Sequence, residues 1–160
     1  MTRVLLNFDG ETMPVDIVDA GPEHLPFVIN SWLTSYREAD EPRKMGNDVF
    51  FRNHHRLVTE LVQRDGVRCL IGVLPDDPSV FIGWACAEPK ERVFHYAFTK
   101  PPFRDAGLLR QLLTVFGLAG GWGTDDEIAL THHTYMIDKM RKRSMRWRRQ
   151  FVYNPYRRTA

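Results

Sequence analysis

The chain has 160 residues and a formal net charge of +2, with 43% hydrophobic and 26% charged residues. This length and composition are typical of one globular domain with its own core, and they exclude a disordered or strongly basic chain. No apolar run approaches the ~20 residues of a membrane span, and the N-terminus lacks the apolar core of a signal peptide, so we expect a cytoplasmic protein.

The two cysteines, Cys69 and Cys86, both lie inside apolar, strand-like runs. In a cytoplasmic protein such a pair is typically reduced and buried, not bridged. The sequence contains no CxxC pair, so a cysteine-based zinc site is not expected.

The first half of the chain reads as one strand and two helices within a single domain over residues 1–160. Residues 1–14 are expected to form an N-terminal extension, and the short alternating run 15–19 predicts a strand. Apolar residues at helical spacing predict a helix up to Tyr36, and a second apolar stripe predicts a helix over 48–64.

Three strands and a loop are expected next. Residues 67–74 and 80–87 flank a turn rich in Pro and Asp, which favours an antiparallel hairpin. A third strand, 93–99, is rich in aromatic residues and leads into a loop at 100–107.

The last part of the chain reads as helix, strand, helix and strand. A helix over 108–116 is ended by the glycine-rich run 117–123, and a strand is expected at 127–132. A basic helix over 135–147 and a last strand over 151–153 complete the order β-α-α-β-β-β-α-β-α-β, which is a mixed α/β fold.

The stretch 98–109 carries the chemistry that is easiest to read, because a strand there runs through a loop directly into a helix. A helix N-terminus offers unpaired backbone N–H groups and a positive dipole end, which suit an anion such as a pyrophosphate. Gly107 lets an anion approach the backbone, and Arg104 adds positive charge. The residues alone are consistent with such a site or with an ordinary turn.

The run Phe103-Arg104-Asp105-Ala106-Gly107-Leu108-Leu109 resembles the acetyl-CoA loop of the GNAT (GCN5-related N-acetyltransferase) superfamily. Arg104 and Gly107 match that pattern, whereas Leu109 stands where Gly or Ala is usual. The order of the elements resembles the family over residues 15–153. The resemblance implies a GNAT-like fold, an acetyl-CoA (CoA) cofactor and N-acetyltransferase activity. It implies cofactor contacts at Tyr96, Ala97, Phe98, Thr99, Arg104, Asp105, Ala106, Gly107, Leu108 and Leu109.

A narrower resemblance is carried by three short runs. The segments 95–100, 131–134 and 153–156 are similar to those of small GNAT-like proteins encoded by bacteriophages. This similarity implies a bacterial or phage-infected host cell as the setting.

The implied reaction moves an acetyl group from a thioester to an amine, on a protein or a small molecule, by direct attack in a ternary complex. The amine must lose a proton, the carbonyl oxygen needs a hydrogen-bond donor, and the leaving thiolate needs a proton. In the family a backbone N–H of the cofactor strand supplies the donor, and Tyr96, Ala97 and Phe98 are the positions that fit.

Candidates for the proton transfers follow from the same resemblance. Glu91 lies thirteen residues before Arg104 and resembles the base of histone-type members, although a carboxylate in a turn is also typical of a solvated surface. Glu88 is a second candidate, and His95 is a third because its reference pKa is ~6.5; a strand histidine is also often simply packed. Tyr135 resembles the general acid of the family, or is a surface or core tyrosine.

The acceptor site is implied near Trp32, Tyr36 and His132, although an aromatic stripe on a helix is also typical of a core. His132 and His133 are neighbours on a predicted strand and face opposite sides, so they cannot easily share a metal. Together with His54 and its neighbour they match no standard metal spacing, and no metal is expected.

Seven basic residues and no acidic residue occur between Lys139 and Arg149. This run is either a solvated helix face, a docking patch for nucleic acid or an acidic partner, or a support for the CoA phosphates. The final strand and tail are compatible with a homodimer. Two further hypotheses therefore stand beside an active transferase: a catalytically inactive GNAT-shaped binding or structural protein, and a nucleic-acid-binding module.

Overall fold

The computed structural model describes residues 1–118 and 126–159, and it is built on one seven-stranded sheet in which each strand pairs with the next along the chain. β1 to β5 pair antiparallel with one another, whereas β6 is parallel to both β5 and β7. The predicted α/β class with a mixed sheet is therefore confirmed. The strands are β1 (Thr2–Phe8), β2 (Glu11–Asp19), β3 (Arg68–Val73), β4 (Phe81–Glu88), β5 (Val93–Thr99), β6 (Ile128–Leu130) and β7 (Phe151–Tyr153).

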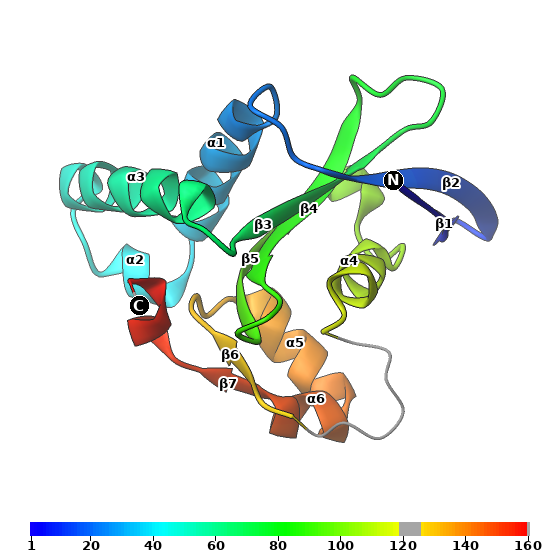
Figure 1. Ribbon diagram of the computed structural model, residues 1–160. Coiled ribbons are helices and arrows are strands. Elements are labelled where there is room, and N and C mark those ends of the chain that lie inside the picture. The colour runs from blue at the N-terminus through cyan, green and yellow to red at the C-terminus, as the bar shows by residue number, and fades with distance from the viewer. Residues whose placement is uncertain (119–125, 160) are drawn as a thin grey trace.

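Helices cover both faces of this sheet (Figure 1). α1 and α3 lie on one face, α4 lies on the other, and α5 and α6 lie beside the short strands β6 and β7. The helices are α1 (Leu25–Tyr36), α2 (Asp40–Arg43), α3 (Asn47–Gln63), α4 (Leu108–Phe116), α5 (Tyr135–Arg143) and α6 (Met145–Gln150), with 3-10 turns η1 (Pro101–Phe103) and η2 (Pro155–Arg158).

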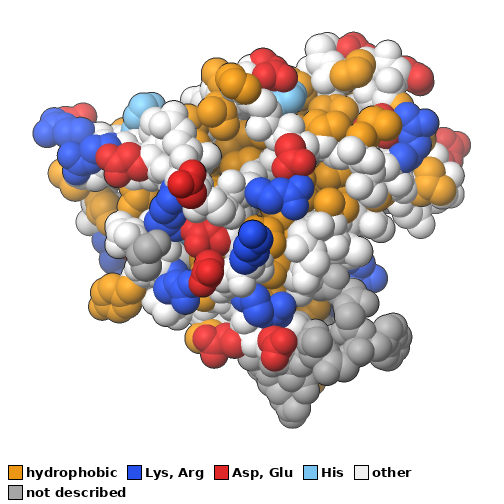
Figure 2. All heavy atoms as spheres, in the orientation of Figure 1, with side chains coloured by type: hydrophobic (Ala, Val, Ile, Leu, Met, Phe, Trp, Pro, Cys, Tyr) orange, Lys and Arg blue, Asp and Glu red, His pale blue; other side chains and the backbone are white. Residues whose placement is uncertain are grey.

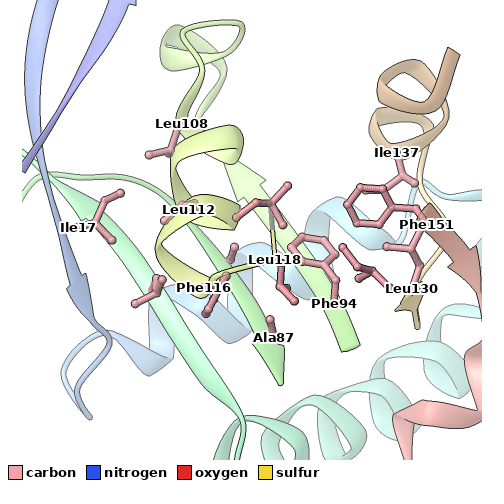
Figure 3. Packing of buried hydrophobic residues seen from close by; sticks show 14 of the residues in the cluster. Ile17, Ala87, Phe94, Leu108, Leu112, Phe116, Leu118, Leu130, Ile137 and Phe151 are labelled. Carbon is pink, nitrogen blue, oxygen red and sulfur yellow. The ribbon is translucent and has the colours of Figure 1, made fainter. Parts of the chain in front are cut away.

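Two apolar cores result, one on each face of the sheet. On the α4 face, Leu108, Leu112 and Phe116 recur at helical spacing and belong to one buried cluster with Phe94 and Phe151 (Figure 3). On the other face a cluster rich in aromatic residues packs α1 and α3 against β3, β4 and β5; its largest members are Trp32, Tyr36, Phe50, Trp84 and Tyr96. The two cores hold β5 between them.

A bulge interrupts the pairing of β4 with β5. Cys86 lies opposite Tyr96, but the next residue, Ala87, lies opposite Phe94. His95 is therefore the extra residue of a β-bulge. A bulge reverses the faces of the residues beyond it, and this one sits where β5 approaches the functional region.

β5 and β6 separate directly after this bulge. They pair only at Val93 with Ala129 and at Phe94 with Leu130. The last bond between their backbones runs from the N–H of Thr131 to the carbonyl of Phe94, at 3.2 Å. Beyond it, no strand among the described residues pairs with the second half of β5 on that side, which leaves a gap between β5 and the start of α5.

The structure corrects two expectations about the chain ends. Residues 1–14 were expected to be an extension, but they form β1 and the first part of β2, because Leu6 of the alternating segment is buried while Leu5 is 63% exposed. The basic helix expected over 135–147 is two helices, because Ser144 leaves the helical conformation and its hydroxyl caps α6 by accepting from the N–H of Trp147. The strand expected at 127–132 ends earlier, at Leu130.

Candidate active site

Two adjoining cavities occupy the gap between β5 and α5. The α4 cavity, of about 500 Å³, lies between the start of α4 and helices α5 and α6. The β5 cavity, of about 410 Å³, runs along β5 toward the end of α1. The two adjoin, because they share the lining residues Thr99, Arg104, Asp105, Leu109, Met136 and Lys139, and together we call them the hollow.

Free backbone N–H groups border the α4 cavity at the start of α4. Gly107, the residue before the helix, has φ +92°, and a side chain added there would meet open space. The first bond back along the helix is donated by Gln111 to the Gly107 carbonyl, so the N–H groups of Leu108, Leu109 and Arg110 have no partner within the helix. This end of α4 therefore presents free N–H groups and a positive dipole end, an arrangement that suits an anion.

Positive charge gathers around the same cavity. Arg104, Arg110, Lys139 and Arg143 line it, and Arg110 also lies over the ring of Trp147, 5.9 Å from its centroid. Two basic residues of the run 139–149, Lys139 and Arg143, thus line the cavity. The side chains of Arg146, Arg148 and Arg149 lie outside the described residues. On the face shown in Figure 2, basic and acidic side chains alternate and form no continuous basic patch.

A backbone N–H of β5 faces the β5 cavity. The N–H of Lys100 donates to a carbonyl of β4, and backbone groups of successive strand residues point to opposite sides. The N–H of Phe98 therefore also points toward β4, while the N–H groups of Ala97 and Thr99 point into the gap between β5 and α5. The Nε of Arg104 donates to the Thr99 carbonyl at 3.1 Å, which agrees with this alternation. Among the three positions predicted from sequence, Ala97 is the one with a free N–H toward the cavity.

The predicted cofactor residues are almost all brought together. Nine of the ten line one of the two cavities, and Ala106 is the exception, because it is buried in the core of the α4 face. Leu109, which departs from the family pattern, packs partly on that core and also lines both cavities. It therefore stands where the two cavities meet.

Tyr135 and Glu38 flank the β5 cavity at its open end. Tyr135 is the first residue of α5, lines the cavity and is 77% exposed, so its hydroxyl is free to meet a bound molecule. Glu38 lines the same cavity beyond the end of α1 and lies 3.5 Å from Arg43. A carboxylate at this place attracts a cationic amine.

Of the other residues predicted for proton transfer, Glu91 lies away from both cavities, whereas His95 lines the β5 cavity with both ring nitrogens already in contact with other side chains. Glu91 is exposed in the turn before β5, 3.9 Å from Arg157, and lines neither cavity. His95 is fully buried, and both of its ring nitrogens already contact Glu88 and Thr131. Burial lowers the pKa of His95 to about 4, although Glu88 opposes that shift, so the ring is neutral near pH 7. Neither Glu91 nor His95 is placed to take a proton from a substrate amine.

Of the three acceptor residues predicted from sequence, only His132 borders the hollow. Trp32 and Tyr36 are buried in the aromatic core, where Trp32 stacks on Tyr96 with ring centroids 5.2 Å apart. The core interpretation of that helical stripe therefore holds. His132 lines the β5 cavity and is itself 2% exposed. Burial and the nearby charge of Arg158 hold the pKa of His132 well below its ordinary value.

Sequence reasoning missed the contact between His54 and His132, whose Nε2 atoms lie 3.0 Å apart. Only their meeting across the fold reveals it, because 78 residues separate them. Within residues 1–118 and 126–159, no three potential metal ligands come together, and every helix is too short or too polar to cross a bilayer. Cys69 and Cys86 are buried, unbridged and opposite one another in β3 and β4.

Comparison with solved structures gives similar folds at low identity. One is AAC(6')-Iy in complex with the bisubstrate analogue CoA-S-monomethyl-acetylneamine, at 19% identity and a TM-score of 0.45 over 81% of this chain and 88% of that chain. The aminoglycoside N-acetyltransferase AAC(6')-Iy in complex with CoA matches at 18% identity and a TM-score of 0.46, over 83% of this chain and 86% of that chain. A ribosomal-protein-alanine N-acetyltransferase from Brucella melitensis biovar Abortus 2308 matches at 17% identity and a TM-score of 0.45, over 81% of this chain and 89% of that chain.

Two of these solved structures are named as N-acetyltransferases. No protein-family model matches this chain, and no curated protein matches it. What the chain does is therefore argued from its own site.

Proposed function

We propose that the protein is an acyl-CoA-dependent N-acyltransferase that moves an acetyl group from acetyl-CoA to an amine of a protein or small molecule. One observation carries this proposal: two adjoining cavities extend from the free N–H groups at the start of α4 to the free N–H of Ala97. An anion site at one end and a carbonyl donor at the other suit a ligand with a pyrophosphate and a thioester.

The residues of the α4 cavity fit the anionic part of such a ligand. The N–H groups of Leu108, Leu109 and Arg110 would hold the pyrophosphate, because their dipoles converge at the helix start. Arg104 and Lys139 add charge where the two cavities meet. This use of the basic side chains favours cofactor support over a nucleic-acid module.

Acetyl-CoA supplies an acetyl thioester when it is bound. The Ala97 N–H would donate to the carbonyl oxygen as charge develops there. Tyr135 would protonate the leaving sulfur, and Glu38 would draw a cationic amine toward the open end of the β5 cavity. The cationic amine first gives one proton to solvent at this open end, and its nitrogen then bonds to the carbonyl carbon as the carbon–sulfur bond breaks. The second proton that the nitrogen loses as the amide forms replaces, through solvent, the proton that Tyr135 gives to sulfur.

Isothermal titration of the purified protein with acetyl-CoA tests the proposal through two glycines of one helix. Gly107 and Gly117 flank α4, both have left-handed backbones (φ +92° and +76°), and a side chain at either would meet open space. Gly107→Glu and Gly117→Glu therefore carry similar backbone strain. We expect only Gly107→Glu to weaken binding, by about 100-fold, or ~2.7 kcal/mol, because it adds negative charge at the anion site.

Equal weakening by both variants, or no binding by the unaltered protein, would contradict a cofactor site at the start of α4. Release of free CoA in the presence of a panel of amines then separates an enzyme from an inactive GNAT-shaped protein. An inactive protein binds acetyl-CoA and releases no CoA.

A further inference from the structure

A chain of hydrogen-bonded side chains runs beneath the point where β5 and β6 separate. His95 Nε2 lies 3.2 Å from Glu88 Oε1, and His95 Nδ1 lies 2.9 Å from Thr131 Oγ1. Thr131 Oγ1 lies 2.8 Å from His132 Nδ1, and His132 Nε2 lies 3.0 Å from His54 Nε2. All five residues are buried, with exposures of 8% or less. We name this set the polar chain.

The carboxylate of Glu88 fixes the direction of every bond in the polar chain. Burial raises the pKa of Glu88, but its bonds with Arg64 and His95 outweigh burial and keep it ionised. An ionised carboxylate only accepts, so His95 must donate from Nε2 and accept at Nδ1. The Thr131 hydroxyl then donates to His95.

The same reasoning extends to the far end. Because the single hydroxyl proton of Thr131 is used on His95, His132 must donate from Nδ1 and accept at Nε2. His54 must therefore donate from Nε2. Three neutral histidines each hold one tautomer, set by a carboxylate that touches only the first of them.

The polar chain holds the two strands where the hollow begins. His95 is the extra residue of the bulge, and Thr131 donates the last backbone bond between β6 and β5. The bulge sets the direction of the residues that follow, including the N–H of Ala97. At the far end, the rings of Trp32 and Tyr36 pack on His132 at 5.2 and 4.8 Å and fix its orientation.

We propose that the polar chain from His54 to Glu88 is a positioning element that aims the Ala97 N–H into the β5 cavity for acyl transfer. It acts through the bulge: His95 and His132 border the β5 cavity, but their ring nitrogens contact other members of the polar chain. The inference rests on the proposed function, since it assigns the residues that orient the carbonyl donor of that reaction.

Removal of one hydroxyl tests this role. Thr131→Val keeps the shape of the side chain and breaks two bonds of the polar chain, whereas Thr131→Ser keeps the hydroxyl. Thr59→Val is the matched control, because the Thr59 hydroxyl is buried and has no hydrogen-bond partner among the described residues.

We expect Thr131→Val to shift the Ala97 amide resonance and to lower kcat about tenfold, with the acetyl-CoA Kd changed less than about twofold. Thr131→Ser should restore both readouts, and Thr59→Val should change neither. An unmoved Ala97 amide in Thr131→Val would overturn the proposal, and that readout requires no turnover. Absence of acetyl-CoA binding by the unaltered protein would instead refute the proposed function.

A second test asks whether a change at Glu88 alters the tautomers of the distant histidines, and it does not depend on whether Thr131→Val folds. In Glu88→Gln the amide can accept or donate, so the direction of the bonds is no longer imposed. We expect histidine ring ¹⁵N spectra to show mixed tautomers at His95, His132 and His54, while Glu91→Gln leaves them unchanged. A response confined to His95 would show that the polar chain is not coupled.

Discussion

The start of α4 and the polar chain border the same hollow but are built differently. At α4 the groups proposed to contact the ligand are backbone N–H groups, and one continuous stretch of the chain, 98–109, positions them. In the polar chain the working groups are side chains from α3, β4, β5 and the segment after β6, and its two terminal members are His54 and Glu88. A backbone site survives most side-chain changes, whereas the polar chain can be broken by removing one atom.

The largest expected effect is a loss of folding stability as the pH falls, and it arises in the polar chain and not at the start of α4. Burial, the dominant cause, lowers the pKa of both His54 and His95 to about 4. The unfolded chain binds protons below its ordinary histidine pKa of ~6.5, whereas the folded chain does not, so stability is complete above that pH and declines toward pH 4. Each histidine contributes up to ~1.4 kcal/mol per pH unit in that window.

Urea unfolding at pH 7 and pH 5 measures this decline. His54→Gln should flatten the pH dependence, while replacement of the neighbouring, exposed His55 by Gln should leave it unchanged. Equal stability of the unaltered protein at the two pH values would contradict neutral, buried histidines in the polar chain.

The next largest effect should come from Tyr135→Phe. Loss of the hydroxyl removes the proton donor proposed for the leaving sulfur, so we expect kcat to fall about 100-fold with an unchanged Kd for acetyl-CoA. Steady-state kinetics and calorimetry measure the two quantities. Tyr156→Phe is a suitable control, because Tyr156 is 85% exposed and lines neither cavity; similar losses in both variants would exclude Tyr135 as the acid.

A smaller, mixed effect is expected from Leu109→Ala on the α4 side. Leu109 is partly buried against the core, so truncation should destabilise the fold by about 1–2 kcal/mol, less than full burial would give. Because Leu109 also lines both cavities, acetyl-CoA affinity should stay equal or increase. Weaker binding in calorimetry would show instead that this side chain supports the ligand.

The smallest effect should come from Glu91→Ala. Glu91 is exposed and lies 3.9 Å from Arg157, and exposed ion pairs of this kind contribute at most ~1 kcal/mol. We therefore expect the free energy of unfolding to change by at most ~1 kcal/mol and kcat to change by less than about twofold. A large loss of kcat in a steady-state assay would restore Glu91 as the base expected from the sequence.

Much of the fold was legible in the sequence where local patterns act. The helix over Leu108–Phe116 and the strand over Val93–Thr99 have the predicted bounds, because apolar periodicity and the flanking Gly and Pro residues act within a few positions. β1 was missed because its pattern is weak without β2 beside it, and the break at Ser144 was missed because the basic run reads as one helix.

The sequence by itself determined the backbone conformation at the start of α4, because Gly107 and the helix that follows act locally. The tertiary structure decided the rest of the site. His54 and His132 read as unrelated residues until α3 and the segment after β6 meet, and His95 reads as a base until its neighbours are seen. Burial and hydrogen bonding set their protonation and roles, and both depend on which distant segments pack together.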